Sequence, residues 1–140
     1  MDTAAQLVLQ PMMQVEIDLF SGRPNPHWQL APSELAELES RLVTLPAAAS
    51  AALPDGLGYR GLHLGPVPAR QMAHEPPWLN PIVALEVGGG VIQATRRNGA
   101  TLHWLDSGRS LECWLLTLAR GRVEEPLRQL ALADLGEACS

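Results

Sequence analysis

The chain has 140 residues, of which 46% are hydrophobic and 18% are charged, so it is long enough for one domain with a buried core and is unlike a disordered chain. Its formal net charge of −5 disfavours a general nucleic-acid-binding protein, which would present a basic face. It has neither an apolar run of the roughly 18 residues that a membrane span needs nor a secretory signal pattern, and we expect a cytoplasmic protein that binds neither nucleic acid nor membrane.

The N-terminal residues 1–12 precede the first regular pattern, and we expect them to be a poorly ordered extension. A single domain is predicted over residues 13–136. Two methionines stand directly before the first strand pattern, and the second, Met13, is a candidate natural start. From Val15 to Phe20 apolar and acidic residues alternate, which predicts a half-buried strand.

The segment 20–28, FSGRPNPHW, connects this strand to a short return strand and is more elaborately specified than a tight hairpin turn requires. Its prolines fix φ and its glycine frees it, while the guanidinium of Arg23 suits a carboxylate or a phosphate. Ser21 and Asn25 either bind a ligand or close the turn through the backbone. Arg23 likewise either binds a ligand or pairs with a carboxylate of the preceding strand. This loop is the first candidate site.

A helix is predicted from Pro32 up to Pro46, because leucines recur there at intervals of three and four residues. A strand over residues 58–64 follows after a turn signal at Pro54-Asp55-Gly56. In this strand His63 and Tyr59 point to the face opposite the leucines.

The segment Tyr59-Arg60-Gly61 is the second candidate cluster. An exposed tyrosine and arginine there would form a pocket with Arg23 and Trp28. The alternative is structural: Gly61 marks a bulge or a close approach of two backbones, and Tyr59 is a half-buried packing residue.

Residues 65–81 contain five prolines and no clear periodicity, which predicts a long loop. Loops of this length are usually functional or disordered. Trp78 lies in this loop, where it either forms an exposed patch for a protein or peptide partner or folds back as a buried anchor.

The second half of the chain predicts three strands, over residues 82–87, 91–95 and 101–105, separated by a Gly-Gly-Gly and an Asn-Gly turn. Helices are predicted over residues 111–120 and from about Pro126 onward. Taken in order, the elements predict an α+β fold, with a mainly antiparallel sheet and helices packed on one face.

The cysteines and histidines suggest no special chemistry. Cys113 lies in an apolar helical stretch and Cys139 is the penultimate residue, so we expect two free thiols and no disulfide. The histidines show no paired metal-ligand spacing, and we predict neither a metal site nor a cofactor. These histidines are His27, His63, His74 and His103.

The sequence contains side chains suited to binding a ligand but no motif that supplies a nucleophile, a general base or a metal site. This imbalance favours a non-catalytic binding or accessory module. It would present its rigid Ser-Gly-Arg-Pro-Asn-Pro loop to a peptide, a protein or a small anionic ligand. The candidate ligand-binding residues are Ser21, Arg23, Asn25, His27, Trp28, Tyr59, Arg60 and His63.

Two alternatives stay open. One is a small hydrolase-like enzyme that uses His27 or His63 as a base and Arg23 as an anion clamp. It requires one of these histidines within hydrogen-bond reach of Asp18, Glu16 or Ser21 in a concave pocket. Two carboxylates on the solvent face of a strand are, however, normally just solvated. The other is a self-associating structural domain.

Three motifs carry a resemblance. The run VEIDLFSGRPNPHWQL, the segment LGYRG and the helix LECWLL together resemble a group of small bacterial and fungal proteins that begin near an FSGRPNPxW motif. The resemblance would cover about residues 13–118 and would make Met13 the natural start. This group has no assigned activity, so the resemblance suggests which proteins are related to this chain but does not suggest a mechanism.

Overall fold

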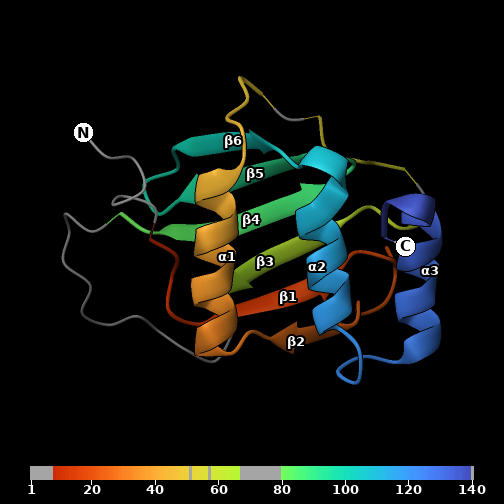
Figure 1. Ribbon diagram of the computed structural model, residues 1–140. Helices are drawn as coiled ribbons and strands as arrows, with labels where there is room; N and C mark the ends of the chain where they lie inside the picture. The colour runs from red at the N-terminus through yellow and green to blue at the C-terminus, as the bar shows by residue number, and fades with distance from the viewer. Residues whose placement is uncertain (1–7, 51, 57, 67–79, 140) are drawn as a thin grey trace.

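The computed structural model describes residues 8–50, 52–56, 58–66 and 80–139, and it contains one six-stranded sheet with helices against it (Figure 1). The strands lie in the order β2-β1-β3-β4-β5-β6, and every neighbouring pair is antiparallel. Their bounds are β1 (Met13–Ile17), β2 (His27–Gln29), β3 (Leu62–Pro66), β4 (Ile82–Gly88), β5 (Val91–Arg96) and β6 (Thr101–Leu105).

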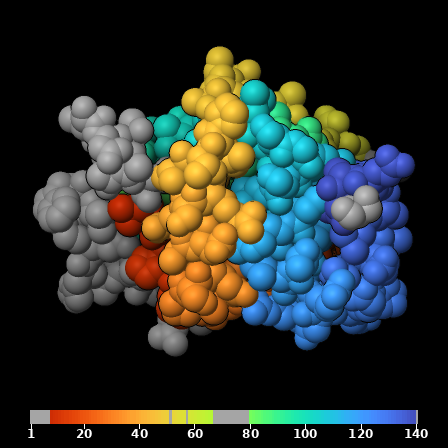
Figure 2. Space-filling model, viewed as in Figure 1, coloured from red at the N-terminus to blue at the C-terminus, as the bar shows by residue number. Residues whose placement is uncertain are grey.

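The helices are α1 (Pro32–Thr44), α2 (Ser110–Leu118) and α3 (Glu125–Leu135), with two short 3-10 helices, η2 (Ser107–Arg109) and η3 (Gly136–Cys139). In Figure 1, α1 and α2 cross one face of the sheet and α3 lies beyond α2. Atoms of these helices cover the centre and the right of the view in Figure 2. The prediction of an α+β fold is therefore confirmed. No helix in the described part of the chain is long and apolar enough to cross a membrane.

The core lies between the sheet and the helices, and the alternation of side chains along the strands builds it. Val15 and Ile17 of β1 are fully buried, and so is Leu62 of β3. A stripe of leucines on α1 closes over them, because residues three and four positions apart share one face of a helix. The residues between them on the strands point to the opposite, open face of the sheet.

Gly61 allows a close approach of two backbones at the start of β3. Its φ is +107°, a conformation that side chains disfavour. A Cβ atom at this position would collide with the carbonyl oxygen of Val87, near the end of β4. Gly61 therefore has the structural role that the second candidate cluster left open.

Residues 8–12 of the expected extension pack against the sheet. Leu9 is only 4% exposed and forms a parallel bridge with Ile82. The backbone N–H of Gln10 donates to the carbonyl of Ile82, and the N–H of Ile82 donates to the carbonyl of Val8. Residues 1–7 lie outside the described residues.

The expectation of two free thiols is wrong, because Cys113 and Cys139 form a disulfide with their Cα atoms 5.3 Å apart. The bond joins residues 26 positions apart. It forms because α3 packs against α2 and η3 then turns the C-terminal residues back onto α2. The residues next to each cysteine in the sequence do not indicate that the chain returns to α2, so the disulfide could not be predicted from them.

Candidate functional site

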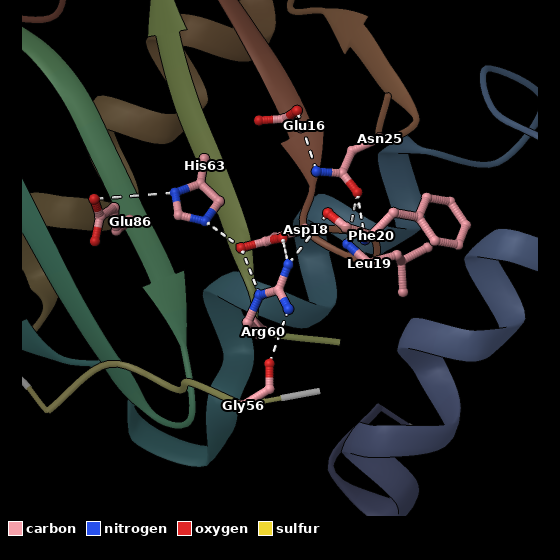
Figure 3. A network of polar contacts seen from close by, with 9 residues as sticks. All are labelled: Glu16, Asp18, Leu19, Phe20, Asn25, Gly56, Arg60, His63 and Glu86. Carbon is pink, nitrogen blue, oxygen red and sulfur yellow. Dashed lines mark hydrogen bonds and ion pairs between the residues drawn. The ribbon is translucent and has the colours of Figure 1, made fainter. Parts of the chain in front are cut away.

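The side chain of Asn25 organises the loop after β1 (Figure 3). Its carbonyl oxygen accepts hydrogen bonds from the backbone N–H groups of Leu19, at 2.9 Å, and Phe20, at 2.7 Å. Its amide group donates to Glu16 Oε2 at 3.3 Å. Asn25 therefore uses these hydrogen bonds to hold its own loop, which is one of the two roles that the sequence left open for it.

Arg23 rests on an aromatic ring. Its guanidinium carbon lies 3.8 Å from the centroid of the Phe20 ring, and the residue is exposed. No carboxylate of the described residues forms an ion pair with Arg23. A cation–π contact does not supply a hydrogen-bond acceptor, so the N–H donors of Arg23 are left for another partner.

Arg60, rather than Arg23, pairs with the carboxylate at the end of β1 (Figure 3). Its Nη2 lies 2.7 Å from Asp18 Oδ1 and its Nε lies 3.2 Å from Asp18 Oδ2. The same guanidinium donates to the backbone carbonyls of Gly56, at 2.8 Å, and Phe20, at 3.2 Å. This arginine therefore joins the segment before β3 to the loop after β1.

Asp18 also contacts His63 on the open face of the sheet. His63 Nε2 lies 2.9 Å from Asp18 Oδ2, and His63 Nδ1 lies 4.0 Å from Glu86 Oε1. Burial by itself raises the pKa of Asp18, but hydrogen bonds from Arg60 and His63 outweigh it and hold this pKa below its usual value. Asp18 is therefore a partnered carboxylate with a side chain only 17% exposed, and not a solvated one.

A hollow of about 370 Å³ lies beside the loop. Its lining brings together Ser21, Arg23 and Arg60, three of the residues that the sequence singled out. The guanidinium of Arg23 has no ionic partner in the described part of the chain, whereas that of Arg60 is neutralised by Asp18. The hollow therefore combines the guanidinium of Arg23, unpaired within the described residues, with backbone of the loop and the ring of Phe20. Its remaining lining residues are Leu19, Phe20, Gly22 and Gly58.

Three other candidate residues lie away from this hollow. Trp28 is buried in the core, and its Nε1 has no hydrogen-bond partner in the described structure. Tyr59 donates its hydroxyl to the buried carboxylate of Glu112, and burial raises the pKa of this tyrosine well above its usual value. His27 is exposed at the start of β2, where its Nδ1 lies 3.2 Å from the carbonyl oxygen of Asn25.

The open face of the sheet carries a row of polar side chains across all six strands. The strand registers pair neighbouring members of the row, in the order His27, Glu16, His63, Glu86, Gln93 and His103. A hollow of about 220 Å³ opens on this row beside Glu16, His63 and Gly65. In the described ranges no three histidine, cysteine, aspartate or glutamate side chains are arranged to hold a metal ion.

Reasoning from the sequence did not place Asp18 or Phe20 among the candidate ligand-binding residues, and it named Asp18 only as a possible partner for a histidine or for Arg23. The alternation along β1 placed Asp18 on the polar face, which is the available signal, but nothing local identifies an arginine 42 positions away as its partner. The sequence singled out Phe20 only as a flank of the loop. Trp78 lies outside the described residues.

A comparison of the chain with protein-family models, curated proteins and solved structures found no significant match. The resemblance to small proteins with an FSGRPNPxW motif therefore stays a prediction. The function has to be argued from the geometry of the two hollows.

Proposed function

We propose that the protein is a non-catalytic binding module that recognises a carboxylate or phosphate group at the hollow beside residues 20–23. The observation that carries this proposal is the state of Arg23, which is exposed, stacked on Phe20 and without an ionic partner among the described residues. A guanidinium held in this way offers a planar edge that matches two oxygen atoms of a carboxylate or phosphate.

The loop supports the proposal because it reduces the conformational entropy that binding costs. Pro24 and Pro26 restrict the backbone on one side of Arg23, and Asn25 fixes the other side through Leu19 and Phe20. Arg60 contributes mainly by position, since its donors already reach Asp18, Gly56 and Phe20.

The test is a titration of ¹⁵N-labelled protein with acetate, succinate and inorganic phosphate, followed by NMR. We expect the backbone signals of residues 20–23 and the side-chain Nε signal of Arg23 to shift saturably. Arg23→Ala should abolish the response and Arg23→Lys should weaken it, because an ammonium lacks the planar fork.

Arg120→Ala is the matched control, because it removes an equally exposed arginine just beyond α2. It should leave the titration unchanged. If Arg23→Ala and Arg120→Ala lose the NMR response equally, the response reflects only the net charge and the proposal is rejected. The absence of a saturable shift with all three anions also rejects it.

A second candidate function, a small hydrolase-like enzyme, is favoured by one observation. His63 lies within hydrogen-bond reach of Asp18, the arrangement that this alternative requires, and it faces the smaller hollow beside Glu16. A carboxylate can orient an imidazole so that its other nitrogen acts as a general base toward water. Arg23 lines the other hollow, so its role as an anion clamp for His63 has no support from the lining residues.

The second candidate is tested with activated esters such as p-nitrophenyl acetate. Turnover that depends on His63 should fall by about two orders of magnitude or more in His63→Gln. His27→Gln is the control, because no carboxylate of the described residues forms a hydrogen bond with His27. Hydrolysis at the rate of the buffer alone, or equal rates in wild type and His63→Gln, rejects the enzyme.

A further inference from the structure

Within the described structure, the outer edge of β2 has main-chain hydrogen-bonding groups without a partner. The backbone N–H of Ile17 donates to Pro26, and the N–H of Leu30 donates to Met13, both at 2.9 Å. Because the groups of an antiparallel strand alternate in direction, those of the intervening His27 and Gln29 point away from β1. No other described strand lies on that side, since β2 is the first strand of the sheet order.

A groove of about 540 Å³ begins at the same place. One wall is the loop from Pro24 to His27, and the other is the connection between α2 and α3 with the first turn of α3. Apolar surface comes from Pro26, Val123 and Leu127. Arg122 also lines the groove, but its guanidinium is bound by both carboxylate oxygens of Glu34, at 2.9 and 2.8 Å.

The loop of residues 20–27 therefore lines two depressions that carry different charged groups. On one side Arg23 presents an open positive charge. On the other side the groove combines the apolar side chains of Val123 and Leu127 with the exposed carboxylate of Glu124. An acidic group is attracted to the first side and repelled from the second, which gives an elongated ligand a preferred direction.

We propose that the ligand is an extended peptide, which adds a strand to the outer edge of β2. Its main chain pairs with His27 and Gln29, an apolar side chain enters the groove beside Leu127, and an acidic residue reaches Arg23. Strand addition of this kind draws affinity from main-chain hydrogen bonds and specificity from pockets for alternate side chains. This inference rests on the proposed function, because it identifies the ligand whose acidic group Arg23 binds.

The probes are synthetic peptides in which valine and threonine alternate and one aspartate is placed at each position in turn. Binding is followed by fluorescence polarisation, and the contacts are mapped by ¹⁵N NMR. We expect the peptides that bind to shift the backbone amides of His27 and Gln29. Gln29→Pro removes one outward N–H group without touching a bond to β1 and should weaken binding at least about tenfold, whereas Gln29→Val should stay within about twofold.

A second experiment tests the pairing without any change to the protein. Peptides methylated at alternate backbone nitrogens on the pairing edge should lose at least about tenfold in affinity for wild-type protein, and those methylated on the other edge should not. Equal binding of the two sets overturns strand addition, and so does peptide binding that leaves the amides of His27 and Gln29 unshifted.

Other outcomes separate this inference from the proposed function. If acetate or phosphate binds at Arg23 and no peptide of the series binds, the peptide inference fails and the anion site stands. If peptides bind at β2 with equal affinity in Arg23→Ala, the contact of their acidic residue with Arg23 is rejected, and the anion site fails as well if acetate, succinate and phosphate cause no saturable shift. A dimer seen by light scattering that is lost in Gln29→Pro and kept in Gln29→Val overturns the peptide proposal, because a second copy then occupies the edge.

Discussion

Asp18 and Arg60 lie at the ends of two neighbouring strands and bind each other through two parallel contacts, 2.7 Å and 3.2 Å long. The backbone follows the same geometry, because the N–H of Asp18 donates to the carbonyl of Gly61 and the N–H of Arg60 donates to the carbonyl of Asp18. The side-chain pair therefore extends the ladder between β1 and β3 into the loops. Arg60 of this pair also lines the hollow beside Arg23.

Replacing Asp18 by asparagine should destabilise the protein in a pH-dependent way. The amide keeps the shape but loses the charge that Arg60 and His63 face, and we expect the free energy of unfolding at pH 7 to fall by about 1 kcal/mol, since the carboxylate is partly exposed. The pKa of Asp18 is lowered in the folded protein, so its contribution is complete above the unfolded pKa of about 4 and is lost as the pH falls below it. Urea unfolding of both proteins between pH 7 and pH 3 measures the difference. A difference that is constant or grows toward pH 3 would contradict this assignment.

Replacing Asn25 by alanine should loosen the loop and weaken anion binding together. Two backbone N–H groups lose their acceptor, and we expect a loss of about 1–3 kcal/mol in the free energy of unfolding. Asn25→Asp keeps an oxygen that accepts from Leu19 and Phe20 but places a second carboxylate beside Glu16. Its stability should therefore lie between those of wild type and Asn25→Ala. Thermal unfolding and the acetate titration test both effects. Full stability in the alanine variant would show that the loop does not depend on these two bonds.

Replacing Gly61 by alanine should be strongly destabilising. The new Cβ atom meets the carbonyl oxygen of Val87, and the backbone conformation disfavours a side chain, so we expect a loss of about 3 kcal/mol or more. Gly65→Ala is the matched control, because Gly65 lies in β3, the strand that Gly61 directly precedes, and has nothing within 4 Å of its Cβ position. Urea midpoints measure both. Similar midpoints for the two variants would contradict the close approach of β3 and β4.

Removing the disulfide should lower stability without changing the fold. The bond closes a loop of 26 positions, and we expect Cys113→Ser to lose about 2–4 kcal/mol through the greater freedom of the unfolded chain. Dithiothreitol should lower the melting temperature of wild type and leave that of Cys113→Ser unchanged. Mass spectrometry of alkylated protein confirms that the wild-type sample is oxidised. An oxidised wild type that melts at the same temperature with and without reductant would contradict the prediction.

Local patterns in the sequence were sufficient to predict most of the regular elements. The leucine spacing predicted α1, and the alternation from Val15 predicted β1, because one buried face imposes its period on the residues that form it. The Asn-Gly turn likewise predicted the hairpin that ends in β6.

The pairing of distant side chains could not be predicted in this way. The sequence suggested a carboxylate partner for Arg23, but it is Arg60 that pairs with Asp18, because β3 lies directly beside β1. The disulfide depends in the same way on the return of η3 to α2. Both are consequences of strand order and helix packing, which no window of neighbouring residues contains.

The two halves of the sheet differ in the loop-closure entropy that the pairing of their strands costs. β4, β5 and β6 follow one another through short turns, so their pairing demands little ordering of the chain. β1 and β3 are instead separated along the chain by β2 and α1, and their pairing brings Ile17 next to Leu62. Loop-closure entropy therefore favours early formation of the β4–β6 meander in folding, with the hollow beside Arg23 assembled only when the two halves of the sheet join.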